Sequence, residues 1–125
     1  MKTLEIKATE ESPAITLTGD GKVLVISGRS TSTLAADSFR QLYLWLDEFG
    51  NQGSLDPLSL EFRLEYYNTL TSRLLLDMLF KLEKLYDKGH LIDVFWHYDK
   101  FDTDLRETGE AYAAMVSLPF NFVAE

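Results

Sequence analysis

Apolar and polar residues alternate in short segments along the chain. Positions 14–18 alternate as a half-buried strand does, and positions 23–27 are mostly apolar and β-branched. Gly19-Asp20-Gly21 separates these two segments and is typical of a hairpin turn. At 58–66 every second residue is apolar, and the residues between them are polar or charged. We therefore predict a hairpin near the start and a later strand with one face open to water.

Apolar residues recur every three or four positions in three other segments, which predicts amphipathic helices. The first runs from Thr33 to Phe49, and the third, which is weaker and acidic, runs from Asp99 to Met115. The second and strongest runs from Leu70 to Lys88, and Gly89 after it is a typical helix C-cap. We expect one stripe of this second helix to face the core: Thr71, Leu75, Met78, Leu82 and Leu85.

Strands are predicted after the second and third helices. Residues 91–98 form one strand, and 118–123 form a short strand or extended segment in which Pro119 favours a sheet edge. Strands and helices that alternate in this way pair in parallel through right-handed crossovers, and the early hairpin adds an antiparallel part. The length of 125 residues indicates one domain, residues 1–125. We predict an α/β (α+β) fold, a mixed sheet with helices packed mainly on one face.

Composition and charge narrow the classes of function. The formal net charge is −8 and no basic cluster interrupts it, so nucleic acid and anionic membrane surfaces would repel the chain. The acidity suits solubility, and it would suit a partner with a basic patch. The chain has no cysteine, which excludes disulfides, thiolate zinc sites and a thiol nucleophile. We find no signal peptide, and no apolar run approaches the roughly 18 residues of a membrane span, so we predict a cytoplasmic protein.

The two histidines are the first candidates for chemistry. His97 is followed two residues later by Asp99, a spacing that could serve a proton relay, but no third group or zinc-ligand spacing accompanies it. His90 follows a helix-ending glycine, and we expect it to be solvated. Glu61 and Glu65 share a strand face about 13 Å apart, farther than paired glycosidase carboxylates. We expect no cofactor and no metal, and an enzyme that uses His97 and Asp99 is an alternative reading.

The junction between the alternating strand and the second helix is rich in hydroxyl groups. Asn68 directly follows the strand and Thr69 directly precedes the helix, and either side chain can serve as the N-cap. A helix N-terminus also favours a phosphate, through unpaired N–H groups and the helix dipole. Phosphorylation there would add about 1.5 to 2 negative charges beside Glu65. The junction can therefore be interpreted as a helix cap or as a phosphoacceptor site, and the two interpretations are compatible.

Short motifs occur in a defined order along nearly the whole chain. They are Thr9-Glu10-Glu11-Ser12-Pro13-Ala14-Ile15, Gly28-Arg29-Ser30, Tyr67-Asn68-Thr69, Leu76-Asp77, Trp96-His97-Tyr98-Asp99, Gly109-Glu110 and Leu118-Pro119-Phe120. In their order and spacing the chain resembles the SiaC family of bacterial regulatory phosphoproteins. The resemblance implies a fold similar to the STAS-type anti-sigma-factor antagonists and a non-enzymatic, partner-switching role.

The resemblance also implies a phosphorylation cycle. It places the phosphoacceptor at Thr69, modified by a dedicated serine/threonine protein kinase and reversed by a PP2C-type phosphatase. The unphosphorylated form would engage a downstream effector such as a diguanylate cyclase, in cyclic-di-GMP and biofilm signalling. This chain has Leu70 and Thr71 where the family usually has two serines. Thr71 and Ser72 are therefore alternative acceptors.

Residues around the acceptor are the expected contacts for partners. These are Glu65, Asn68, Leu70 and Arg73. Thr31-Ser32-Thr33-Leu34 replaces a Tyr-Pro-Glu-Asn segment that is common in the family, so a partner that touches it would differ. A constitutive adaptor, bound through the open sheet face without modification, is a further alternative.

Overall fold

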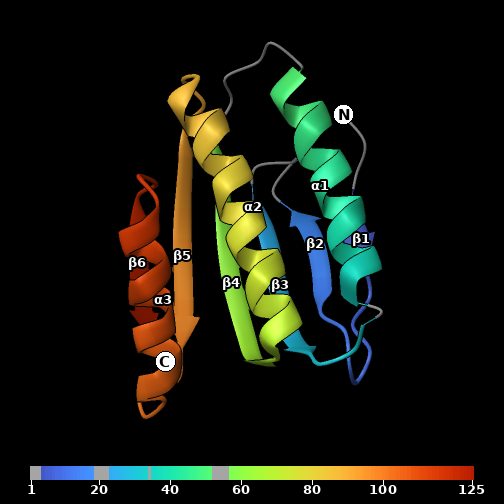
Figure 1. The fold of residues 1–125 in the computed structure, drawn as a ribbon, viewed down its shortest axis with the longest axis vertical. Coiled ribbons are helices and arrows are strands. Elements are labelled where there is room, and N and C mark those ends of the chain that lie inside the picture. The colour runs from blue at the N-terminus through green and yellow to red at the C-terminus, as the bar shows by residue number, and fades with distance from the viewer. Residues whose placement is uncertain (1–3, 19–22, 34, 52–56) are drawn as a thin grey trace.

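The computed structural model describes residues 4–18, 23–33, 35–51 and 57–125. They form one mixed sheet whose strands lie side by side in chain order (Figure 1). The strands are β1 (Glu5–Ile6), β2 (Ala14–Thr18), β3 (Val23–Ser30), β4 (Leu58–Tyr67), β5 (Ile92–Tyr98) and β6 (Phe120–Ala124). The helices are α1 (Ala35–Asn51), α2 (Thr69–Asp87) and α3 (Thr103–Met115).

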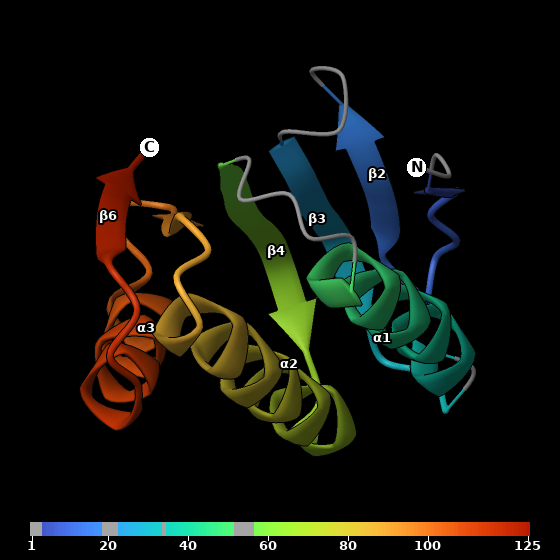
Figure 2. The same cartoon turned by 90° about the horizontal axis from the view of Figure 1, so that it is seen from above.

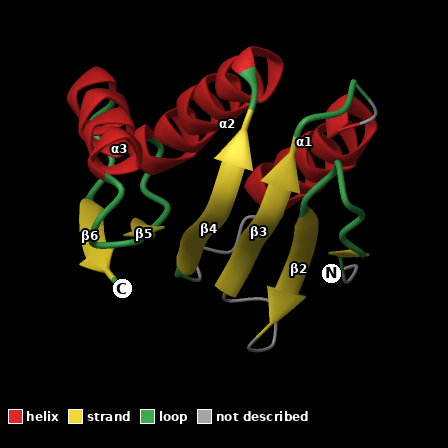
Figure 3. Ribbon diagram, turned by 90° about the horizontal axis from the view of Figure 1, so that it is seen from below, coloured by secondary structure: helices red, strands yellow, loops and turns green. Residues whose placement is uncertain are grey.

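The pairing of the strands explains why one face of the sheet stays open. β1, β2 and β3 pair antiparallel, and β3 to β6 pair in parallel. Each parallel pair is joined by one helix and the strand order never reverses, so right-handed crossovers place the helices on the same face. Figures 2 and 3 show α1, α2 and α3 on one side and an uncovered face on the other. The predicted mixed sheet with helices on one face is confirmed.

The hydrophobic core lies between the helices and the covered sheet face. The α2 stripe that the sequence predicted is buried, and Trp96 of β5 packs against Phe62 of β4 with ring centres 5.5 Å apart. The largest fully buried side chains are Trp96, Phe39, Phe62, Ile15, Leu24, Ile26, Leu42, Leu46, Leu58, Leu60, Leu75 and Met78. No helix in the described ranges is long and apolar enough to cross a membrane.

Several element boundaries differ from the prediction or lie outside the described residues. α3 begins at Thr103 rather than Asp99, because Asp102 accepts a hydrogen bond from the Leu105 N–H and acts as the N-cap. β6 is an edge strand, as Pro119 predicted. β2 and β3 pair as the arms of a hairpin, but the Gly19-Asp20-Gly21 turn itself lies outside the described residues.

Candidate functional site

The start of α2 separates the two roles that the sequence left open. Asn68 is the N-cap, and its Oδ1 accepts a hydrogen bond of 3.0 Å from the Thr71 N–H. Thr69 is the first residue of the helix and is exposed. Its hydroxyl makes no hydrogen bond with any residue in the described parts of the chain. Asn68 therefore caps α2, and Thr69, the next residue, is exposed.

Polar contacts fasten this helix start to the end of β3. The Asn68 N–H donates to the Ser30 carbonyl, and its side-chain Nδ2 donates to the Thr31 carbonyl, both at 3.0 Å. The Thr71 hydroxyl donates to the Ser30 carbonyl at 3.1 Å, so the Ser30 hydroxyl, 2.6 Å from Thr71 Oγ1, is the donor between the two side chains. Ser30 and Thr71 are both fully buried.

The two alternative acceptors are less accessible than Thr69. Thr71 is 0% exposed, and its hydroxyl is held by Ser30. Ser72 is half-buried, and its hydroxyl lies 2.8 Å from the Tyr112 hydroxyl of α3. A kinase would have to disrupt packing to reach either residue, whereas Thr69 is already exposed.

The N-terminal motif joins the same end of the molecule. The Glu11 carbonyl accepts hydrogen bonds from the N–H groups of Thr31 and Ser32, at 2.8 and 3.0 Å. A turn shapes this segment, because Thr9 Oγ1 accepts from the Ser12 N–H at 2.9 Å. Segments that are distant in sequence are thus tied together through Thr31, whose carbonyl binds Asn68. Leu34, the last residue of the segment Thr31-Ser32-Thr33-Leu34, lies outside the described residues.

A shallow cleft of about 420 Å³ opens beside Thr69. It is lined by Glu65, Tyr66, Tyr67, Asn68, Thr69, Ser72, Asp102, Asp104, Leu105 and Thr108. Three of these residues carry a carboxylate, and none is lysine or arginine. Arg73, the nearest basic residue along α2, is exposed and pairs with Asp77 at 3.2 Å. The surroundings of the Thr69 hydroxyl are therefore acidic on the cleft side.

A β-bulge sets the shape of the cleft wall. Gly28 of β3 pairs with Leu64 and the next residue, Arg29, pairs with Tyr66, so Glu65 has no partner in the register. Gly28 adopts φ 98°, which glycine tolerates without strain. The sequence predicted an unbroken alternation with Tyr66 on the apolar face, and this is wrong. The extra residue turns the Tyr66 ring outward, where it is 54% exposed and the Arg29 guanidinium lies 5.4 Å from its centre.

Tyr67 forms the inner wall of the cleft. Its hydroxyl oxygen is buried and has no hydrogen-bond partner among the described residues. Burial raises the pKa of this hydroxyl above its ordinary value, and the neighbouring Tyr112 acts in the same direction. Tyr67 therefore stays neutral at physiological pH and adds no charge to the acidic cleft.

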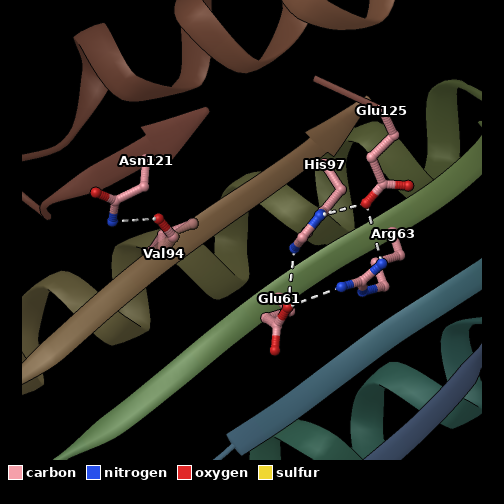
Figure 4. Close-up of polar contacts among 6 residues, drawn as sticks. All are labelled: Glu61, Arg63, Val94, His97, Asn121 and Glu125. Atoms are coloured by element: carbon pink, nitrogen blue, oxygen red, sulfur yellow. Dashed lines mark hydrogen bonds and ion pairs between the residues drawn. The ribbon is translucent and has the colours of Figure 1, made fainter. Parts of the chain in front are cut away.

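His97 lies between two carboxylates, and neither of them is Asp99. The His97 ring nitrogens lie 2.8 Å from Glu61 Oε1 and 2.7 Å from Glu125 Oε1, and Arg63 contacts both carboxylates (Figure 4). Asp99 instead accepts a hydrogen bond from the Phe101 N–H. The structure thus does not form the His97–Asp99 pair. Among the described residues, no group of three or more potential ligands could hold a metal ion.

His90 is buried rather than solvated, which corrects the expectation from the sequence. Gly89 adopts φ 106° and turns the chain back at the end of α2. The His90 N–H then donates to the Leu85 carbonyl, and the ring packs 5.3 Å from the Phe49 ring. The helix-ending glycine was read correctly from the sequence, but its consequence for the next side chain was not.

The mixed sheet with three helices on one face defines a small α/β protein, in which Asn68 caps a helix that begins with an exposed threonine. A model of the SiaC family of regulatory phosphoproteins matches residues 6–125, and this chain belongs to that family.

Relatives and solved structures of the family cover nearly the whole chain. An uncharacterized protein of Pseudomonas aeruginosa strain UCBPP-PA14 is 31% identical over 96% of this chain and 94% of its own length. Apo-SiaC from Pseudomonas aeruginosa is 31% identical, with a TM-score of 0.89 over 99% of this chain and 100% of that one. SiaC in complex with the diguanylate cyclase SiaD, which it activates, is 30% identical, with a TM-score of 0.90 over 98% of this chain and 99% of that one.

Proposed function

We propose that this chain is a non-enzymatic switch protein that activates a diguanylate cyclase when Thr69 carries no phosphate. The exposed position of Thr69, directly after the N-cap residue Asn68 at the start of α2, is the observation that carries the proposal. The similarity to SiaC, an activator bound to its cyclase, extends over 98% of the chain and supports the same kind of partner. The regulators of the switch would be a dedicated serine/threonine protein kinase and a PP2C-type phosphatase.

The chemistry around Thr69 explains how a phosphate would release the partner. Leu70, next to Thr69, is 39% exposed and offers an apolar contact. A phosphate beside it would add about 1.5 to 2 negative charges and would have to lose water when a partner covers Leu70. We therefore assign the partner contact to Glu65, Asn68, Leu70 and Arg73, and expect phosphate to weaken it.

The test compares Thr69→Ala and Thr69→Asp for activation of a purified diguanylate cyclase from the same organism. We expect the alanine variant to bind and activate it as the unmodified protein does, and the aspartate variant to bind at least about tenfold more weakly. Thr103→Asp is a matched control, because Thr103 is also an exposed first helical residue behind a capping side chain, Asp102. The control should leave activation unchanged.

Mass spectrometry of protein from cells with and without the kinase and phosphatase locates the modification. Phosphate on Thr71 or Ser72 in place of Thr69 would show the assignment to be wrong. Equal cyclase affinity for the alanine and aspartate variants would favour a constitutive adaptor.

A further inference from the structure

Arg73 and Thr69 lie one turn apart on the exposed surface of α2. Side chains four residues apart on a helix are neighbours. The Arg73 side chain is 75% exposed, and its Nε lies 3.2 Å from Oδ1 of Asp77, which is four residues farther along the helix. Exposed ion pairs of this kind contribute little to stability. Arg73 therefore stands between two positions with which it can pair, and it is held only weakly by one of them.

The order of charges along the helix favours the other position. An ion pair across one turn is stronger when the acidic residue precedes the basic one. The negative charge then lies nearer the positive N-terminal end of the helix dipole, and the positive charge lies nearer its negative end. Arg73 precedes Asp77, which is the weaker order. A phosphate on Thr69 would precede Arg73, which is the stronger order. It would also carry more charge than a carboxylate and offer three acceptor oxygens to the guanidinium.

The opposite side of Thr69 offers a phosphate no cation. The cleft there is lined by the carboxylates of Glu65, Asp102 and Asp104, and no lysine or arginine among the described residues lines it. Arg29 lies over the exposed Tyr66 ring, 5.4 Å from its centre, and is not one of the residues that line the cleft. Repulsion from the cleft and attraction from α2 therefore act on the phosphate in the same direction.

We propose that Arg73 is the counter-ion of phosphothreonine 69, and that it leaves Asp77 when the phosphate is added. The proposal rests on the proposed function, since it takes Thr69 as the acceptor. In the unmodified protein Arg73 is open to an acidic side chain of a partner. In the phosphorylated protein the phosphate on Thr69 pairs with Arg73 and neutralises its charge. The Asp77 carboxylate then loses its partner and is open to solvent. The phosphate would thus change two turns of the α2 surface.

The test uses the full chain with phosphothreonine placed at position 69 by genetic code expansion, so that no kinase is needed. The second ionisation of the phosphate, ordinarily near pH 6, is followed by ³¹P NMR. A nearby cation favours the dianion, so Arg73→Ala should raise the midpoint by about 0.2 to 0.4 pH units. Arg40→Ala is the matched control, since Arg40 is an exposed arginine paired with Asp37 within α1, and it should leave the midpoint unchanged.

A second readout follows the arginine itself. In the phosphorylated protein, the Arg73 Nε–H resonance should move with the same midpoint as the phosphate, and in the unmodified protein it should stay still through that range. An unchanged phosphate midpoint in Arg73→Ala, or a shift caused by Arg29→Ala in its place, would overturn the proposal. The phosphate is installed directly, so a negative result would concern only the role of Arg73. The proposed switch at Thr69 is tested separately, by activation of the cyclase.

Discussion

At the scale of single residues, Asn68 makes the hydrogen bonds that hold the start of α2, and Thr69 makes none of them. Its Oδ1 caps α2 and its Nδ2 holds the Thr31 carbonyl, whereas the Thr69 side chain is exposed. A capping residue stabilises a protein by about 0.5 to 2 kcal/mol relative to alanine. The residue that stabilises the junction and the proposed phosphoacceptor are therefore neighbours, and substitution can separate their roles.

Asn68→Ala should lower the free energy of unfolding by about 1 to 2 kcal/mol, because it removes the cap and the bond to Thr31 together. Thr69→Ala should change it by less than about 0.5 kcal/mol, as substitutions of exposed side chains usually do. Urea denaturation followed by circular dichroism measures both. Equal losses in the two variants would contradict the assignment of the cap.

Asn68→Asp distinguishes the two bonds that Asn68 makes. Aspartate keeps an acceptor for the Thr71 N–H and places a negative charge at a helix N-terminus, which is favourable. It has no N–H to donate to the Thr31 carbonyl. We expect a stability between those of the unmodified protein and Asn68→Ala, measured in the same urea series.

At the scale of elements, α3 is attached to the sheet through a glycine. A Cβ on Gly109 would lie 2.5 Å from Cδ1 and Nε1 of the Trp96 indole. Trp96 is 1% exposed, and its Nε1 donates to the Leu105 carbonyl one turn earlier in α3. The helix therefore lies directly on the indole ring, and this accounts for the glycine of the Gly109-Glu110 motif.

Gly109→Ala should destabilise the protein by about 1 to 3 kcal/mol, although alanine normally favours a helix, because the rigid indole leaves no room. Gly50→Ala in α1 is the comparison. Its Cβ would lie 2.6 Å from Cδ2 of Leu85, the end of a flexible side chain that can rotate away. We expect Gly50→Ala to be close to neutral. Thermal unfolding of both variants checks this, and equal losses would show that the indole is not the obstacle.

At the scale of the whole molecule, local patterns in the sequence predicted the helices and strands. They did not predict the contacts between segments that are distant in the sequence. Alternation located the strands, and a spacing of three or four residues located the helices, because both patterns depend on neighbours along the chain. The partners of His97 are 36 and 28 residues away, at Glu61 and Glu125. Ser30 and Thr71 are 41 residues apart. Such partners depend on strand order and register, which alternation alone does not fix.

The candidate site shows the same division. Asn68 and Thr69 were recognisable because capping is local. The acidic wall from Asp102 and Asp104 instead comes from the N-cap and first turn of α3, which begins more than thirty residues later in the sequence. The bulge opposite Gly28 could not be recognised from the sequence either. One unpaired residue reverses which face of the strand the following side chains point to, and it leaves no mark in the composition. The family motifs mark these places, and the structure supplies their physical reasons.

The charge of the whole molecule gives a final prediction for the phosphorylated form. The net charge is −8, and a phosphate on Thr69 brings it to about −10, beside the carboxylates of Glu65, Asp102 and Asp104. Salt shortens the Debye length from about 30 Å at 0.01 M to about 3 Å at 1 M. Added NaCl should therefore stabilise the phosphorylated protein more than the unmodified one, because one arginine cannot offset this repulsion.

We expect the difference in unfolding free energy between the two forms to change by about 0.5 kcal/mol in favour of the phosphorylated form over this range of salt. Thermal unfolding of each form in low and high NaCl measures it, and general effects of salt on folding cancel in the comparison. Thr69→Ala should respond to salt as the unmodified protein does, since it leaves the charge unchanged. An equal salt response in the phosphorylated and unmodified forms would mean that the acidic cleft does not act on the phosphate, because repulsion between exposed charges must weaken as they are screened.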